Sequence, residues 1–135
     1  MIVGAEVARY IYAEIKRLKI NFTASDRAPD TFELLRRHCS ERSIIVWNGA
    51  SEHTIYGDPK VNHAFRAWHD SLHLILNAPF TLTGEIFVAR EQARLAPDPI
   101  AKLIIAEVQG QAEYFAEHRV FPADQVKFVL DYIKR

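Results

Sequence analysis

The chain has 135 residues, the usual size of one domain, and we expect residues 1–135 to form a single domain. It carries 17 Lys and Arg against 17 Asp and Glu, so its formal net charge is zero. This balance argues against a dedicated nucleic-acid binder, because such proteins usually carry a basic excess.

Cysteine content and hydropathy point to the compartment. Cys39 is the only cysteine, which excludes an internal disulfide and fits a reducing environment. The N-terminal segment lacks the basic and then apolar pattern of a signal peptide. No stretch approaches the ~20 apolar residues of a membrane span. We therefore expect a cytoplasmic protein that does not enter a membrane.

The apolar residues recur with helical spacing over most of the chain. They predict helices over about residues 3–19, 31–39, 60–77, 82–95, 98–118 and 122–134. Residues 21–30 are rich in Asn, Ser, Asp and Pro and are expected to form a loop. The runs 43–47 (SIIVW) and 54–56 (TIY) predict two strands that would form a small hairpin. The expected class is α+β and mostly helical, with five or six helices and a two-stranded β-hairpin.

Two histidines stand four residues apart in the run His69-Asp70-Ser71-Leu72-His73. On a helix, residues four apart lie one above the other. Two imidazoles at this spacing can bind a single Zn²⁺. A helical projection of residues 61–77 places both histidines, Asp70 and Arg66 on one side, opposite the apolar residues. That side has no Lys or Glu, which indicates a functional face rather than an ordinary solvated one.

Two carboxylates fall within apolar helix faces further along the chain. Glu85 lies in the middle of the apolar face of 82–95, with Gln92 beside it. Glu107 and Gln111 lie in the middle of the apolar face of 98–118. A carboxylate directed into a core is costly unless it is paired or binds a metal. The pattern favours a polar centre shared with the histidine helix, and structural ion pairs are the alternative.

The run HDSLH resembles the HExxH motif of zincin metallopeptidases, with Asp in place of Glu. A strand at 44–48, the motif helix and the sequence GEIFVA at 84–89 follow one another in an order similar to the small bacterial and phage zinc metallopeptidases of the ImmA/IrrE type. The resemblance covers roughly residues 43–97. It implies that His69, His73 and Glu85 are the metal ligands.

The same resemblance places Asp70 where the general base stands. Asp is one methylene shorter than Glu, and a general base tolerates little misplacement. Glu107 is therefore the alternative base, and the site could also bind metal without catalysis. Arg66 lies on the same helix face as the histidines and could hold an anionic group of a substrate.

We accordingly expect a metal-dependent hydrolase that uses zinc or another divalent transition metal. A peptide is the first substrate hypothesis, and a nucleotide or another phosphoester is the second. An HD-type phosphohydrolase is a competing interpretation, with ligands from His38, the His69-Asp70 doublet, and Glu107 or Asp124.

A third hypothesis is non-enzymatic, and the sequence leaves this choice and the oligomeric state open. A small helical protein could bind a host partner through Trp47, His53 and Tyr56. The stretch AFRAWHDSLH resembles runs in small uncharacterised phage proteins. This second resemblance implies a phage origin and residence in the host cytoplasm.

Overall fold

The computed structural model describes residues 4–135, which form a mostly helical α+β fold. This confirms the predicted class. Residue 3, where the first predicted helix begins, lies outside the described residues. The helices are α1 (Ala5–Arg17), α2 (Phe32–His38), α3 (Pro59–Leu76), α4 (Leu82–Ala93), α5 (Asp98–Ile105), the π-helical turn η1 (Ala106–Gly110), α6 (Gln111–His118) and α7 (Gln125–Ile133), and the strands are β1 (Asn21–Ser25) and β2 (Ser43–Trp47).

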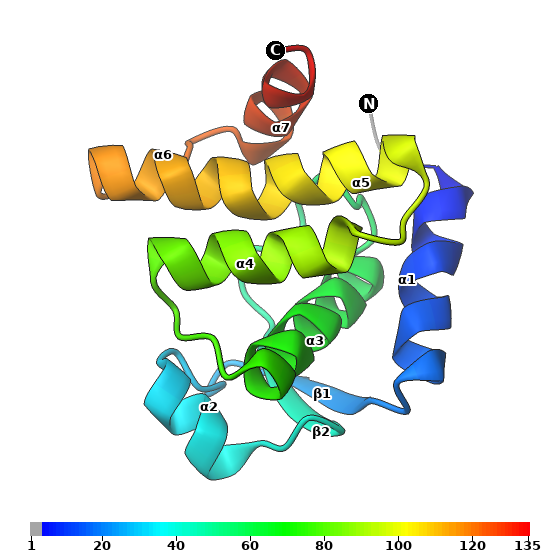
Figure 1. The fold of residues 1–135 in the computed structure, drawn as a ribbon, viewed down its shortest axis with the longest axis vertical. Coiled ribbons are helices and arrows are strands. Elements are labelled where there is room, and N and C mark those ends of the chain that lie inside the picture. The colour runs from blue at the N-terminus through cyan, green and yellow to red at the C-terminus, as the bar shows by residue number, and fades with distance from the viewer. Residues whose placement is uncertain (1–3) are drawn as a thin grey trace.

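Helix α3 lies at the centre of the arrangement (Figure 1). α5, η1 and α6 follow one another as one continuous helix, which lies beside α4 and runs in the opposite direction. α3 packs against α4, against α1 and against β2, and α7 packs on η1. This placement brings the histidine helix and the helix that carries Glu85 into direct contact.

The two strands pair in parallel, with Asn21 opposite Ser43 and Ser25 opposite Trp47. The predicted antiparallel hairpin is therefore wrong, and part of the predicted loop 21–30 is strand β1. Parallel neighbours need a crossover, which α2 supplies here. The segment Thr54–Tyr56 is a buried turn, in which the backbone N–H of Gly57 donates to the carbonyl oxygen of Thr54.

Local signals explain where α3 begins and ends. The Asp58 carboxylate accepts from the backbone N–H of Lys60, and Pro59 occupies the first turn, where its missing N–H costs nothing. At the other end Asn77 has a left-handed φ of 51°. The N–H of Asn77 then bonds the carbonyl of Leu74, and the N–H of Ala78 bonds the carbonyl of His73. This pair of bonds is a Schellman motif, and it turns the chain back towards α3.

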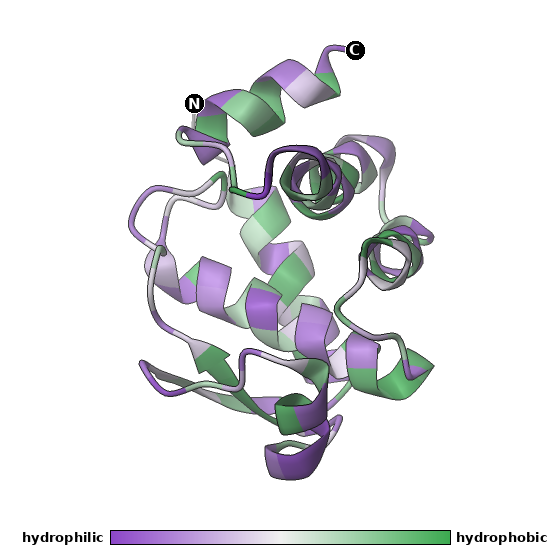
Figure 2. Ribbon diagram, turned by 90° about the vertical axis from the view of Figure 1, so that its left-hand side faces the viewer, coloured by the Kyte–Doolittle hydropathy of each residue, from purple (hydrophilic) through white to green (hydrophobic). Residues whose placement is uncertain are grey.

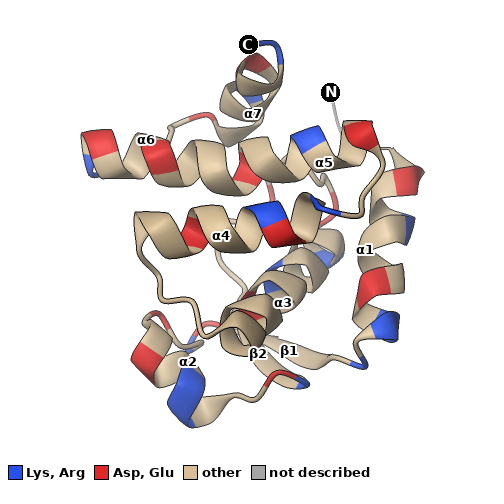
Figure 3. Ribbon diagram, in the orientation of Figure 1, with Lys and Arg blue, Asp and Glu red and all other residues tan. Residues whose placement is uncertain are grey.

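Both sides of α3 are covered by protein. Trp68 and Phe65 belong to the main hydrophobic cluster, whereas Ala67 packs with Ile44 and Val46 of β2. Figure 2 shows hydrophilic and hydrophobic residues alternating along the helices. In Figure 3 acidic and basic residues are interspersed over the elements. Among residues 4–135, no helix combines the length and the hydropathy needed to cross a membrane.

Candidate metal centre

Three predicted metal ligands meet between α3 and α4. Nε2 of His69 lies 2.8 Å from Oε1 of Glu85, and Nε2 of His73 lies 3.1 Å from the same oxygen. The two Nε2 atoms are 3.0 Å apart. Within the described part of the chain, these three residues form the one group of His, Cys, Asp or Glu side chains close enough to hold a metal ion.

The spacing of these atoms suits a small metal ion. Zinc binds imidazole nitrogen and carboxylate oxygen at about 2.0–2.2 Å, so tetrahedral ligand atoms lie about 3.3 Å from one another. The observed separations of 2.8, 3.0 and 3.1 Å are slightly shorter than this value. A shift of a few tenths of an ångström would therefore accommodate a metal ion, and the chemistry of the three donors fits zinc.

The outer nitrogen of each imidazole has its own partner. Nδ1 of His69 lies 2.8 Å from Oε1 of Gln92, and Nδ1 of His73 lies 2.7 Å from the carbonyl oxygen of Ala78. Both partners are hydrogen-bond acceptors, so both Nδ1 atoms carry a proton and donate it. A neutral imidazole of this tautomer presents a lone pair at Nε2, which is the form that ligates a metal.

The link between α3 and α4 sets this geometry. The Schellman motif at Asn77 directs the carbonyl of Ala78 onto the His73 ring. Thr81 then starts α4 by accepting from the backbone N–H of Gly84. Gly84 lies against the Pro79 backbone so closely that an added Cβ would overlap the carbonyl oxygen of Pro79. This close approach places Glu85, the next residue, opposite the histidines.

Aromatic side chains surround the histidines. The centroid of the His73 ring lies 4.8 Å from that of Phe80. The His69 ring is stacked on the ring of Phe65, with the two centroids 6.2 Å apart. The His73 side chain is fully buried, whereas those of His69 and Glu85 keep 15% and 24% of their exposure. The residual exposure of the group therefore lies on His69 and Glu85. An accessible position beside three protein ligands is what separates a catalytic zinc site from a closed structural one.

Charges within the group change the pKa values of its members. Burial by itself would lower the pKa of His69, but the charge of Glu85 and its hydrogen bond outweigh burial and raise that pKa to about 9. Burial would raise the pKa of Glu85, and the positive charge of His69 lowers it well below the usual range instead. In the metal-free protein an imidazolium of His69 consequently faces an ionised Glu85.

Two further carboxyl groups lie close enough to interact with the group electrostatically. Burial raises the pKa of Asp70 to about 6, against the opposing charges of His69 and His73. Burial raises the pKa of Glu107 to about 8, although Gln111 donates a hydrogen bond to its carboxyl group at 2.9 Å. Glu107 stands on the π-helical turn η1, a feature frequent at functional sites. The structure thus brings both predicted candidate bases to the neighbourhood of His69.

Arg66 is engaged elsewhere. Its guanidinium donates to the carbonyl oxygens of Trp47, Gly49 and Ala50. These bonds tie α3 to the segment that follows β2. The predicted role in holding an anion stays a prediction, and three of the five N–H donors of the guanidinium already bond carbonyl oxygens.

The residues predicted as ligands of an HD-type site do not lie together in the structure. His38 lies exposed at the end of α2, and Asp124 caps α7 by accepting from the backbone N–H of Lys127. Neither belongs to the group described above. Of the residues predicted to contact a host partner, Trp47 is 51% exposed, whereas Tyr56 is only 3% exposed and cannot contribute to a contact surface.

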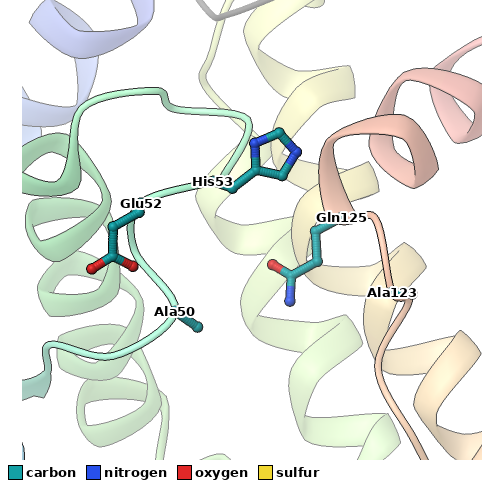
Figure 4. A pocket seen from close by; sticks show the side chains of 5 residues that line it. All are labelled: Ala50, Glu52, His53, Ala123 and Gln125. Carbon is teal, nitrogen blue, oxygen red and sulfur yellow. The ribbon is translucent and has the colours of Figure 1, made fainter.

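A separate crevice of about 250 Å³ lies between the segment after β2 and the start of α7 (Figure 4). It is lined by Ala50, Glu52, His53, Ala123 and Gln125. None of the three candidate ligands lines it, so this crevice is not part of the metal centre.

Gln92 and the Ala78 carbonyl are the members that sequence reasoning missed. Gln92 was visible as a polar residue in an apolar helix face, a signal that the carboxylates also gave. A backbone carbonyl has no sequence signal of its own. No family model, curated protein or solved structure matches the chain. The fold and the site define a mostly helical α+β protein with a candidate His/His/Glu metal centre.

Proposed function

We propose that this protein is a zincin-like metal-dependent hydrolase in which His69, His73 and Glu85 hold zinc or another divalent transition metal. The observation that carries the proposal is the convergence of two imidazole Nε2 atoms and one carboxylate oxygen within 3.1 Å of one another. A metal ion with three protein ligands activates a water molecule and polarises the bond that is cleaved. Partial exposure of Glu85 supports access for a substrate.

The charges around the centre favour a peptide over a phosphoester. Glu85 is ionised beside His69, and Asp70 carries a negative charge above about pH 6. Against the effect of burial, the positive charge of Arg66 lowers the pKa of Asp70 and of Glu107. Its guanidinium already bonds three carbonyls. A neutral amide suits this environment better than an anionic phosphate, since like charges repel at short range.

Two residues are candidates for moving the proton. A general base works best when its pKa lies near the working pH. In the metal-free protein the pKa values are about 6 for Asp70 and about 8 for Glu107, and both lie near neutral pH. Asp70 adjoins a ligand in sequence, whereas Glu107 stands on η1, where the charge of His69, against the effect of burial, lowers the pKa of its carboxyl group. Either can accept a proton from a nucleophilic water and return it to the leaving amine.

Metal analysis of the purified protein tests the first part of the proposal. We expect one equivalent of zinc per chain after incubation with zinc and gel filtration, measured by inductively coupled plasma mass spectrometry. His69→Ala should lose most of this metal, because it removes one of three ligands. His53→Ala is the matched control, since its imidazole is 75% exposed and lies outside the centre. Equal metal content in all three proteins would refute the metal centre.

Activity assays test the second part. Quenched fluorescent peptides and a panel of nucleotides should be offered to the zinc-loaded wild type and to the Asp70→Asn and Glu107→Gln variants. We expect peptide cleavage by the wild type and a loss of about 10²–10⁴-fold in the variant that lacks the base. Cleavage of nucleotides alone would overturn the peptide assignment. Inactivity of the metal-loaded protein towards both classes would overturn the hydrolase assignment.

A further inference from the structure

Gln92 occupies an unusual position behind the candidate ligands. It is 2% exposed, on α4, and its Oε1 lies 2.8 Å from Nδ1 of His69. Its Nε2 is buried and has no hydrogen-bond partner within the described part of the chain. A buried donor without a partner costs free energy. The carboxamide therefore satisfies His69 while one of its own polar atoms is left without a partner.

The direction of this hydrogen bond decides what His69 can bind. A neutral imidazole carries one proton, and an acceptor at Nδ1 holds that proton there. The lone pair is then at Nε2, on the side that faces Glu85 and His73. If the carboxamide were reversed, its Nε2–H would face Nδ1 and favour the other tautomer. The proton would then sit at Nε2 of the ring and block ligation.

The partner of His73 differs from that of His69 in kind. Its Nδ1 donates to the backbone carbonyl of Ala78, an acceptor that no side-chain substitution removes. His69 depends on a side chain from the opposite helix. Gln92 is thus the replaceable part of the support for the two histidines.

We propose that Gln92 is a positioning residue of the metal centre, which holds His69 in the tautomer and ring orientation that present Nε2 to the metal. This inference rests on the metal site proposed above. Partners of this kind change metal affinity by 10–100-fold when they are removed from known metal sites. Gln92 acts through His69 and does not touch the metal.

Two variants of similar size separate the acceptor from simple packing. Gln92→Leu fills the space without an acceptor, and Gln92→Glu keeps an oxygen at the same reach. The apparent affinity for Co²⁺ should be measured by competition with a chelator, together with the visible absorption of the Co²⁺ complex. We expect Gln92→Leu to bind 10–100-fold more weakly and to show a changed spectrum. Gln92→Glu should bind Co²⁺ at least as tightly as the wild type, because its carboxylate oxygen still accepts from Nδ1 and raises the basicity of the imidazole.

Gln111→Ala is the control, because Gln111 is also a buried glutamine but bonds Glu107 instead of a ligand. It should leave Co²⁺ affinity unchanged. Thermal unfolding of the metal-free variants shows whether each one folds. A wild type that binds no Co²⁺ would refute the metal centre itself. A metal-binding wild type whose affinity Gln92→Leu leaves unaltered would refute only the role of Gln92.

Nuclear magnetic resonance of the zinc-loaded wild type tests the same inference without any variant. Long-range correlations between ring protons and ring nitrogens identify which nitrogen carries a proton. We expect a protonated Nδ1 in His69, in slow exchange with water, and a metal-bound Nε2. A metal-bound or unprotonated Nδ1 would overturn the assignment.

Discussion

The Nε2 atoms of His69 and His73 lie 3.0 Å apart and both face Oε1 of Glu85. Each ring already donates its Nδ1 proton outward, to Gln92 and to Ala78. One additional proton, on Nε2 of His69, satisfies all three inner atoms in the absence of metal. This proton lies where the metal would bind, so proton and metal compete for the same place.

Metal affinity should therefore depend on pH. The pKa of His69 in the metal-free protein is raised to about 9 by Glu85, against the effect of burial. Below that pH, binding must displace one proton, so the apparent affinity should rise about tenfold per pH unit from about pH 6 and level off near pH 9. Competition titrations with a chelator, corrected for its own protonation, measure this slope. A flat profile would contradict a proton on His69.

The stability of the metal-free protein should depend on Glu107. Burial raises the pKa of its carboxyl group from 4.5 to about 8, so folding favours the neutral form. This contribution to stability is fully present below pH 4.5 and is lost as the pH rises through about 8. Glu107→Gln removes the loss, and should make the protein more stable than the wild type at about pH 9 by an amount on the order of a few kcal/mol.

Guanidinium unfolding near pH 4 and near pH 9 measures this difference. At the lower pH the two proteins should differ little, since a neutral carboxyl group and a carboxamide have similar size. Glu117→Gln serves as the control because the Glu117 side chain is 78% exposed. If Glu107→Gln destabilised the protein equally at both pH values, the carboxyl group would not be neutral in the folded state.

The helices could be predicted from the sequence because their signals are local. Apolar spacing and Pro residues located the helices, including α3 and α4, to within a few residues of their ends. Strand β1 could not be predicted in the same way. NFTAS does alternate between polar and apolar residues, but it is only five residues long and leads into a segment rich in Asn, Ser, Asp and Pro that predicts a loop. Its partner β2 lies beyond a helical crossover. The pairing is a tertiary event that neither strand signals alone.

The metal centre, like the fold, could be predicted from the sequence only in part. The spacing of His69 and His73, and the position of Glu85 in an apolar face, are visible in the sequence. The acceptors behind the rings are not, because Gln92 meets His69 only when α4 packs on α3. The carbonyl of Ala78 reaches His73 only through the left-handed turn at Asn77. A ligand pattern can be predicted from spacing, whereas its support depends on the packed chain.

Substitution of Arg66 tests whether this residue has a structural role or binds an anion. Arg66→Lys should destabilise the protein by about 1–3 kcal/mol, because an ammonium group cannot replace a guanidinium bonded to three separated carbonyls. Inhibition of the zinc-loaded protein by inorganic phosphate should not change. Thermal unfolding and an inhibition series measure the two effects. Loss of phosphate inhibition with unchanged stability would instead assign Arg66 to anion binding.

The turn after α3 should be sensitive to side-chain shape. Asn77 has a φ of 51°, a conformation that costs a β-branched residue about 1–2 kcal/mol. Asn77→Val should therefore lower stability by about this amount and weaken metal binding, since the same turn holds the carbonyl of Ala78 against His73. Asn77→Gly should preserve both properties.

Lys19 provides the matched control for this turn. It follows α1 with a φ of 56°, so Lys19→Val should cost similar stability. It is not part of the metal centre, and its substitution should leave Co²⁺ affinity unchanged. Equal losses of affinity in Asn77→Val and Lys19→Val would indicate a general loss of folding rather than a local effect on His73.

The start of α4 should tolerate no side chain at position 84. A Cβ on Gly84 would overlap the carbonyl oxygen of Pro79 and lie 3.1 Å from its carbonyl carbon. Backbone atoms cannot move aside as a flexible side chain does, so α4 would have to shift. Gly84→Ala should then cost about 1–3 kcal/mol of stability. Because Glu85 is the next residue, the shift should also weaken Co²⁺ binding, and Gly4→Ala, whose Cβ would meet nothing within 4 Å, should leave Co²⁺ binding unchanged. Thermal unfolding and Co²⁺ titration measure both effects, and wild-type values for Gly84→Ala would contradict the close approach that places Glu85 opposite His69 and His73.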